Sequence, residues 1–367
     1  MIYVAARKHT AREAFAKPAE EKSMRLEEVN GNIFYNGDCI VGARACIPDD
    51  SVDLIVTDPP YGINGDRLHH HYNRDERFVV GGYVEVPASD YGAFSRNWIR
   101  EAARVLRPGG SIYIVSGYTN LYHILHALRQ TDLREVNHII WRYNFGVYTS
   151  RKYVSSHYHI LFYEKPGGKR TFNLESRYGT GEKAQDNGSL NYRDREDVWC
   201  INREYKPGQA KNKNELPTEL LAKMIQYSSN EGDLVCDMFL GGFSTARTAI
   251  GLNRRATGFE ISGRVFDLKI EELRNTGEGY LLPSLRAPQT GGQENRGLPW
   301  TDDDREILVS RFAGLVESGE TKRKAVEILG RELGRGRWSI EKMLKIQGVR
   351  TGSRQTGPGR GGSGKGV

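Results

Sequence analysis

The sequence is poor in the residues that build disulfide or metal frameworks. It has four cysteines, none of which forms a Cys-x-x-Cys pair. This set excludes a disulfide scaffold and a zinc ribbon. No apolar run approaches the roughly 20 residues that cross a membrane, and the N-terminus has no hydrophobic signal core. We therefore expect a cytoplasmic protein with reduced thiols and no membrane partner.

One cluster of potential metal ligands is His69-His70-His71. Three adjacent histidines do not share a face of a helix or a strand. They lie in a Gly-rich, charged stretch, 62–92, that reads as a long loop. Metal binding is one interpretation of these residues, but a solvated loop is favoured, and we predict no metal site. Loops of this length inside a compact domain often have a function, and this one could fold over a bound polymer.

Positive charge is in surplus and is unevenly spread. The formal net charge is +7. Residues 165–214 hold eleven Lys/Arg against seven Asp/Glu, and residues 299–367 hold fourteen against nine. Two basic stretches on a near-neutral body favour a nucleic-acid partner, with plain solubility as the alternative.

The run Val52–Val56 suits a buried strand and leads through Thr57 to Asp58-Pro59-Pro60-Tyr61. A strand cannot continue through two prolines, so the tetrapeptide should form a stiff loop at the carboxyl end of a parallel strand. Ligands bind at that edge of open α/β sheets. A carboxylate and a proline carbonyl beside a flat ring suit an exocyclic amino group on a heterocycle. The alternative is an ordinary turn with a buried tyrosine, so a cofactor site is needed elsewhere in the chain.

The rest of the chain alternates strands and helices, as an α/β fold requires. A strand at 33–35, a turn at Asn36-Gly37-Asp38 and a helix of about ten residues precede Val52. Because both loops lie at one sheet edge, we expect Asp38 and Asp58 to lie close together. Further strands are predicted at 111–115, 136–141, 159–164, 234–237 and 256–260, and further helices at 91–106, 120–129, 218–228 and 244–252. Pro108-Gly109-Gly110 should separate the helix at 91–106 from the next strand.

A second site is predicted where the strand 234–237 ends at Asp237. A turn follows, Met238-Phe239-Leu240-Gly241-Gly242-Phe243-Ser244-Thr245, then a helix and a strand that ends at Glu260. Strand, glycine turn, helix, strand and acid is a nucleotide-binding arrangement. The turn is not Gly-x-Gly-x-x-Gly, and Asp237 would repel a pyrophosphate but pair with an α-amino group. Glu260 could accept hydrogen bonds from ribose hydroxyls, so S-adenosylmethionine fits better than a dinucleotide.

With both sites in this order, the sequence resembles the β group of DNA amino-methyltransferases, which methylate adenine N6 or cytosine N4. The resemblance runs from Asn36 to Glu272. It implies a Rossmann-like S-adenosylmethionine-dependent sheet in circularly permuted order, with S-adenosylmethionine as cofactor and double-stranded DNA as partner. A homodimer and a cognate restriction nuclease could accompany it, in the cytoplasm of a prokaryotic or phage-infected cell.

The resemblance also implies a role for each matching residue. Asp58, Pro59, Pro60 and Tyr61 correspond to the catalytic tetrapeptide. The residues implied in cofactor binding are Asp38, Pro217, Thr218, Asp237, Phe239, Leu240, Gly241, Gly242, Phe243, Ser244, Thr245 and Glu260. Two positions depart from the family pattern: Leu216 stands where a histidine precedes Pro-Thr, and Phe243 stands where a second turn glycine is expected. These departures concern the local cofactor geometry more than the function.

The implied reaction is methylation of adenine N6 after the base has left the duplex. Asp58 and the Pro59 carbonyl would accept from the amino group, and Tyr61 would stack on the flipped base. In this family, an aspartate before Pro-Pro-Tyr favours adenine as the target base. The alternatives are an N4-cytosine enzyme, a catalytically degenerate DNA-binding protein of the same fold, and methylation of RNA or protein.

Five segments are predicted. They are an N-terminal extension (1–30), a methyltransferase domain (31–274) with a basic target-recognition segment (165–214), a linker (275–298), a three-helix module (299–348) and a disordered tail (349–367). Asp197-Val198-Trp199 could anchor the basic segment. Thr301, Thr321 and Ser339 mark the expected helix starts of the module. It faintly resembles a helix-turn-helix or Myb-like DNA-binding unit, with a protein-contact bundle as the alternative.

Overall fold

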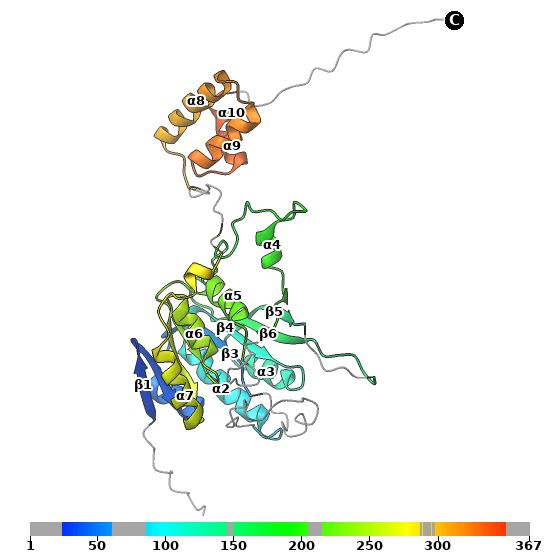
Figure 1. Ribbon diagram of the computed structural model, residues 1–367, viewed down its shortest axis with the longest axis vertical. Helices are drawn as coiled ribbons and strands as arrows, with labels where there is room; N and C mark the ends of the chain where they lie inside the picture. The colour runs from blue at the N-terminus through cyan, green and yellow to red at the C-terminus, as the bar shows by residue number, and fades with distance from the viewer. Residues whose placement is uncertain are drawn as a thin grey trace, which may run out of the picture.

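The computed structural model describes residues 24–60, 86–144, 150–204, 215–286, 288, 295 and 298–349. Its centre is a nine-stranded mixed sheet with helices on both faces (Figure 1). The strand order is β1-β2-β9-β8-β3-β4-β6-β5-β7. The strands are β1 Arg25–Val29, β2 Asn32–Asn36, β3 Val52–Thr57, β4 Leu106–Ser116, β5 Arg134–Arg142, β6 His157–Glu164, β7 Val198–Cys200, β8 Leu234–Asp237 and β9 Arg255–Glu260. The predicted α/β fold is confirmed.

The sheet is parallel across its centre, from β2 through β9, β8 and β3 to β4. β6 is antiparallel to both β4 and β5, so β5 and its parallel neighbour β7 run in the direction of the central strands. β8, late in the chain, lies beside β3, early in the chain, as a circularly permuted order requires. Chain connections change direction between these two strands, and such a point is where open α/β sheets bind ligands.

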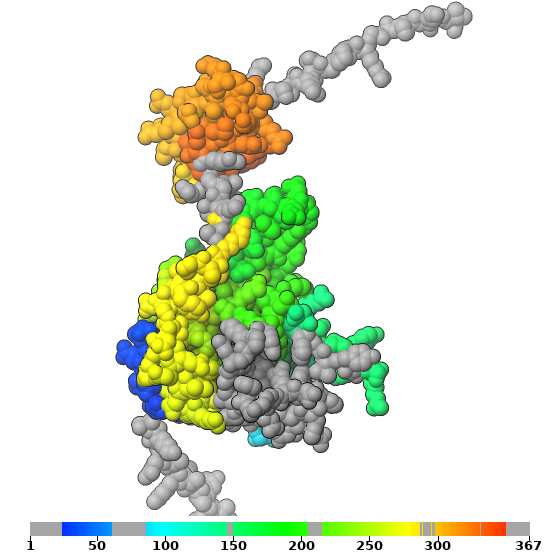
Figure 2. All heavy atoms as spheres, in the orientation of Figure 1, coloured from blue at the N-terminus to red at the C-terminus, as the bar shows by residue number. Residues whose placement is uncertain are grey.

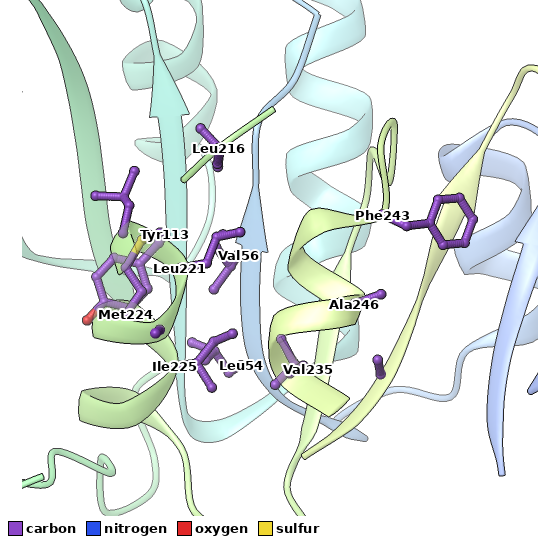
Figure 3. Close-up of a cluster of buried hydrophobic side chains, with 14 of the residues drawn as sticks. Leu54, Val56, Tyr113, Leu216, Leu221, Met224, Ile225, Val235, Phe243 and Ala246 are labelled. Carbon is purple, nitrogen blue, oxygen red and sulfur yellow. The ribbon is translucent and has the colours of Figure 1, made fainter. Parts of the chain in front are cut away.

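Helices cover the two faces of the sheet. They are α1 Cys39–Cys46, α2 Tyr91–Val105, α3 Leu121–Leu128, α5 Thr218–Ser228, α6 Ser244–Gly251 and α7 Gly263–Arg274, while α4 Leu190–Asp194 lies in the basic segment. One buried cluster joins the sheet to α5, α6 and α7, and another joins it to α1, α2 and α3. Figure 3 shows part of the first, where Leu54 and Val56 of β3 lie beside Leu221 and Ile225 of α5. Alternate residues of β3 therefore enter opposite cores.

The predicted start of β4 was wrong. The strand begins at Leu106, immediately after α2, and runs through Pro108-Gly109-Gly110. Gly109 has a φ of +78°, and a β-carbon there would lie 2.5 Å from the Lys169 carbonyl oxygen. The register with β3 shifts between Val52 and Leu54. Glycine thus permits an irregularity within the strand where the sequence suggested a break before it.

The ordered domain is larger than the predicted methyltransferase segment. β1 forms an antiparallel hairpin with β2, so the sheet begins at Arg25. At the other end, the backbone of residues 279–281 bonds to α6, and Arg286 forms an ion pair with Glu182. In Figure 2 the yellow chain that follows α7 lies against the green segment that contains Glu182. Part of the expected extension and part of the expected linker therefore belong to this domain.

The basic segment has more structure than its sequence pattern predicted. It contains α4, and β7 pairs in parallel with β5. Trp199 is buried, as expected of an anchor, with the Lys223 ammonium 4.4 Å from its ring centroid. Asp194 of α4 binds both Arg177 and the Tyr227 hydroxyl. The segment is thus fixed to β5 and α5 rather than lying loosely on the surface.

Three helices form the C-terminal module: α8 Asp302–Glu317, α9 Lys322–Glu332 and α10 Arg337–Ile346. The Thr301 and Thr321 hydroxyls accept hydrogen bonds from first-turn amides, which confirms these two predicted caps. The predicted cap Ser339 was wrong, because Gly336 is the N-cap of α10 and Ser339 lies within the first turn. Its hydroxyl instead lies 3.3 Å from the Trp300 indole nitrogen. Within the described residues, no helix combines the length and the apolar character needed to span a bilayer.

Candidate active site

The loop after β3 begins with Asp58, which is half-buried, and Pro59, which is buried. The Tyr91 hydroxyl, on the first residue of α2, donates a hydrogen bond of 2.8 Å to the Pro60 carbonyl oxygen. This bond fixes the second proline of the loop to the helix that covers the sheet. Tyr61, the long loop predicted at 62–92 up to residue 85, and the three histidines lie outside the described residues.

The turn after β8 meets the β3 loop directly. The Thr57 hydroxyl, on the last residue of β3, donates a 2.8 Å hydrogen bond to Oδ1 of Asp237, on the last residue of β8. Two predicted sites that are 180 residues apart in sequence are therefore joined by one buried bond. Both sites lie at the carboxyl ends of parallel neighbours, on the same edge of one sheet.

Asp237 is buried and well supplied with donors. Its Oδ1 also accepts from the Phe239 amide at 3.0 Å, and the Thr245 side chain is a further partner. Burial raises the pKa of the carboxyl, while these hydrogen bonds counter part of the rise. A buried carboxylate held this way at a sheet edge is suited to a cationic ligand group, which would restore the solvation that burial removes.

Glu260 closes the turn from the end of β9. Its Oε2 accepts from the Gly241 amide at 2.9 Å and its Oε1 from the Ser262 amide at 2.7 Å. Burial raises its pKa to about 7, and nearby Asp237 adds to the rise. Each carboxylate oxygen retains acceptor capacity beyond its one backbone bond, as binding to ligand hydroxyls requires.

The turn needs its glycines for different reasons. Gly241 has a φ of +48°, which a residue without a side chain adopts at little cost. A β-carbon on Gly242 would lie 2.2 Å from an oxygen of Glu215. The backbone at Gly242 therefore passes directly against another carboxylate, and no larger residue fits without displacing it.

Phe243 departs from the expected glycine yet keeps the backbone conformation of one, with φ 59° and ψ 22°. Its ring is fully buried, 5.5 Å from the ring of Phe34 and 5.9 Å from that of Phe266. In Figure 3 the ring points away from the helix that it precedes and toward the neighbouring strand. The side chain is thus a core residue, and the strain of a left-handed phenylalanine is offset by aromatic packing.

The other predicted cofactor residues are spread along the same region. The Leu240 side chain is buried against Gly258, and the Phe239 ring packs 5.3 Å from Trp98 of α2. Thr218 and Ser244 line a small cleft together with Glu204, Glu215 and Arg247. Pro217 is the N-cap of α5, and its neighbour Thr218 donates its amide to Glu204.

Asp38 lies in the turn between β2 and α1. Its carboxylate caps α1, accepting from the Ile40 and Val41 amides at 2.9 and 3.0 Å. The preceding strand, β2, is separated from β3 by β9 and β8. The expectation that Asp38 and Asp58 are close neighbours therefore did not allow for two inserted strands, which come from the far end of the chain.

The sequence reasoning missed three residues of this site: Thr57, Tyr91 and Glu215. Thr57 could have been found, since a hydroxyl that follows the buried apolar run Leu54–Val56 requires a partner. Tyr91 begins a helix after a long loop, and nothing in its local sequence indicates its contact with Pro60. Glu215 contacts Gly242 and Arg247 only through tertiary packing.

Comparison with known proteins places these features in one family. The sequence model of the amino-group (N6/N4) DNA methylases matches residues 52–271. The chain is 30% identical over 241 residues to the type II methyltransferase M.HpaI of Haemophilus parainfluenzae, covering 64% of this chain and 72% of that protein. It is 28% identical over 275 residues to M.HinfI of Haemophilus influenzae, covering 68% and 71%.

Two solved structures are also similar. The cytosine-N4-specific PvuII DNA methyltransferase matches with a TM-score of 0.49 and 13% identity, over 68% of this chain and 94% of that one. The complex of M1.HpyAVI with SAM matches with a TM-score of 0.45 and 20% identity, over 65% and 98%.

Proposed function

The chain belongs to the DNA methylase family that modifies amino groups, and we propose that it methylates adenine N6 in duplex DNA with S-adenosylmethionine as the donor. One observation carries the proposal. The loop suited to hold an amino group and the turn suited to hold a charged nucleoside are adjacent, joined by the Thr57–Asp237 hydrogen bond. The relatives are type II methyltransferases, which supports action at a specific DNA sequence.

The residues at the turn fit S-adenosylmethionine. Asp237 is a buried carboxylate that a ligand ammonium would neutralise. Glu260 offers acceptors for the two ribose hydroxyls, and the first turn of α6 offers backbone amides for the methionine carboxylate. The cofactor supplies a methyl carbon bonded to a positively charged sulfur. The protein supplies a carboxylate for the ligand ammonium at the end of β8 and a carboxylate for the ribose hydroxyls at the end of β9.

Asp58 and Pro59 act on the other substrate. An exocyclic amine is a weak nucleophile because its lone pair is delocalised into the heterocycle. The amino group would donate one hydrogen bond to the Asp58 carboxylate and one to the Pro59 carbonyl. These two bonds would localise the lone pair on nitrogen and direct it toward the cofactor turn. Tyr91 contributes by holding the loop through Pro60. This is catalysis by positioning and electrostatics.

Access to the loop requires the target base to leave the duplex. We propose that Tyr61 stacks on the flipped base and that the basic segment contacts the DNA around it. Supporting the second point, β7 and the end of β5 bring the segment to the same sheet edge as Asp58. There the Arg203 guanidinium lies 5.0 Å from the Tyr143 ring centroid and 5.4 Å from that of Tyr158.

The target base is tested by product analysis. The protein is incubated with mixed-sequence duplex DNA and S-adenosylmethionine labelled in the methyl group, and the DNA is then digested to nucleosides. Label should appear in N6-methyladenine. Label in N4-methylcytosine would overturn the choice of base but keep the reaction class. No transfer, together with no heat of cofactor binding by calorimetry, would indicate a degenerate DNA-binding protein.

Cofactor affinity should depend on pH through Glu260. With a pKa of about 7 in the free protein, this group is largely protonated below pH 7 and a better acceptor for ribose hydroxyls above it. Affinity should therefore rise about tenfold from pH 6 to pH 8, with proton release on binding. Calorimetry in buffers of different ionisation enthalpy measures both quantities. The Glu260→Gln variant should lose this step, and an equal pH dependence in that variant would contradict the assignment.

A further inference from the structure

The C-terminal module has a hydrophobic core of its own. Its buried residues are Leu308, Phe312, Ala325, Val326, Leu329, Leu333, Ile340, Met343 and Leu344, contributed by all three helices and the turn after α9. Among the described residues after α7, residues 279–286 bond to the domain of the sheet. The module has a core separate from the two cores of that domain.

A four-residue turn, 333–336, joins α9 to α10, as in helix-turn-helix units. Arg335 in this turn is buried. It pairs with Asp304 at 2.8 Å, bonds to the Leu298 carbonyl oxygen at 2.8 Å, and lies 4.2 Å from the Trp300 ring centroid. This arginine therefore fixes α10 relative to the start of α8 and is not available to a ligand.

Charge is divided sharply within the module. Residues 299–317, which include α8, hold five Asp/Glu against two Lys/Arg. Residues 322–346, which span α9 and α10, hold eight Lys/Arg against three Asp/Glu, and seven of the eight remain when the buried Arg335 is left out. The first helix is acidic and the other two are basic, so a polyanion would be attracted to α9 and α10 and repelled by α8.

The outer side of α10 carries an unusual combination of groups. Trp338 is 72% exposed, Lys342 and Lys345 are also exposed, and the three recur at helical spacing along one stripe, here called the α10 face. The Lys342 ammonium lies 4.9 Å from the Trp338 ring centroid. On the opposite side of α10, Ile340, Met343 and Leu344 face the core. Trp338 thus stands one and two turns before the two lysines, with its ring largely in solvent, and exposed Ile346 adds a second apolar side chain to the same helix.

We propose that the α10 face is a second duplex-DNA contact, with α10 entering the major groove and its lysines neutralising backbone phosphates. The aromatic ring offers apolar contact with base edges such as the thymine methyl, and the lysines supply the charge. The basic side of the module is complementary to DNA, which the family membership makes the substrate class. The contact does not depend on which base is methylated. It lengthens the time that the protein stays bound to DNA, while the chemical step takes place at the loop after β3.

The test uses the full chain and duplex DNA of mixed sequence, with binding followed by fluorescence anisotropy over a series of salt concentrations. The Lys342→Ala/Lys345→Ala variant should bind about tenfold more weakly at low salt. Its slope of log affinity against log salt should be smaller in magnitude by about 2, because two phosphate contacts are lost. Trp338→Ala should weaken binding by a similar factor and leave the slope unchanged.

The control is Arg305→Ala/Arg311→Ala, which removes the same charge from α8, at half-buried Arg305 and exposed Arg311. It should bind DNA like the wild type, and all variants should unfold at the wild-type temperature. Methyl transfer at saturating DNA should be equal in all of them, which separates this contact from the proposed function. Unchanged affinity and slope in both α10 variants would overturn the proposal. An equal loss of DNA affinity in the α8 control would also overturn it. A change of oligomeric state in the α10 variants, without a change in DNA affinity, would do the same.

Discussion

Replacing Asp58 with alanine should lower the rate of methyl transfer by about 1,000-fold, while the affinity for S-adenosylmethionine stays within about twofold of the wild type. The carboxylate is the charged acceptor of the loop, and its loss leaves only the Pro59 carbonyl to orient the amino group. The cofactor turn is held by Thr57, Phe239 and Glu260 instead. Single-turnover kinetics with labelled donor, alongside calorimetry, measures the two quantities separately.

Asp53 provides a matched control at the other end of the same strand. Its carboxylate binds Arg107 at 2.5 Å and the Leu234 amide at 2.8 Å, so it fixes the start of β8 beside β3. Asp53→Ala should lower the unfolding temperature but leave the chemical step of the folded fraction near the wild-type rate. A variant Asp58→Ala that keeps more than about a tenth of the wild-type rate would rule out the proposed role.

The second large effect is expected from Asp237→Asn, which should weaken S-adenosylmethionine binding about 100-fold. Asparagine keeps the volume and one oxygen for the Thr57 hydroxyl and the Phe239 amide, but it carries no charge to pair with a ligand ammonium. Since burial already raises the pKa of Asp237, the neutral variant should unfold at or above the wild-type temperature. Calorimetric titration and thermal unfolding test the two parts.

Asp233→Asn is the corresponding control at the opposite end of β8. Asp233 accepts from the Asn230 amide at 2.7 Å and belongs to a surface turn. Its replacement should leave cofactor affinity unchanged. Wild-type affinity in Asp237→Asn would show that the buried carboxylate stabilises the turn and does not bind the ligand.

The sequence predicted the parallel core and both halves of the site because each depends on local chemistry. Pro59-Pro60 ends a strand by removing amide donors, and Gly241 permits a backbone angle that other residues avoid. Such backbone constraints act on a residue independently of its tertiary contacts. The order of segments then resembled one family closely enough to predict a sheet in circularly permuted order.

What the sequence did not predict depends on partners that are distant in the chain. Lys165 accepts and donates backbone bonds with Gly109 and Gly110, and these bonds keep a Pro-Gly-Gly stretch inside β4. The start of α10 was misplaced because Ser339 satisfies the cap pattern while its hydroxyl is used by Trp300. Phe243 departs from the glycine expected in the turn, and local sequence does not reveal that Phe34 and Phe266 pack around its ring.

The bond between Thr57 and Asp237 also has a consequence for synthesis on the ribosome. β3 emerges early, but its neighbour β8 emerges only after the basic segment and α5 have been made, and β9 follows β8. Until then one edge of β3 is unpaired, and the nascent chain must avoid pairing it wrongly. A chain cut short before Leu234 would display Asp58 with no cofactor turn beside it. Competence for the reaction is therefore acquired late and in one step, when the last parallel strands dock.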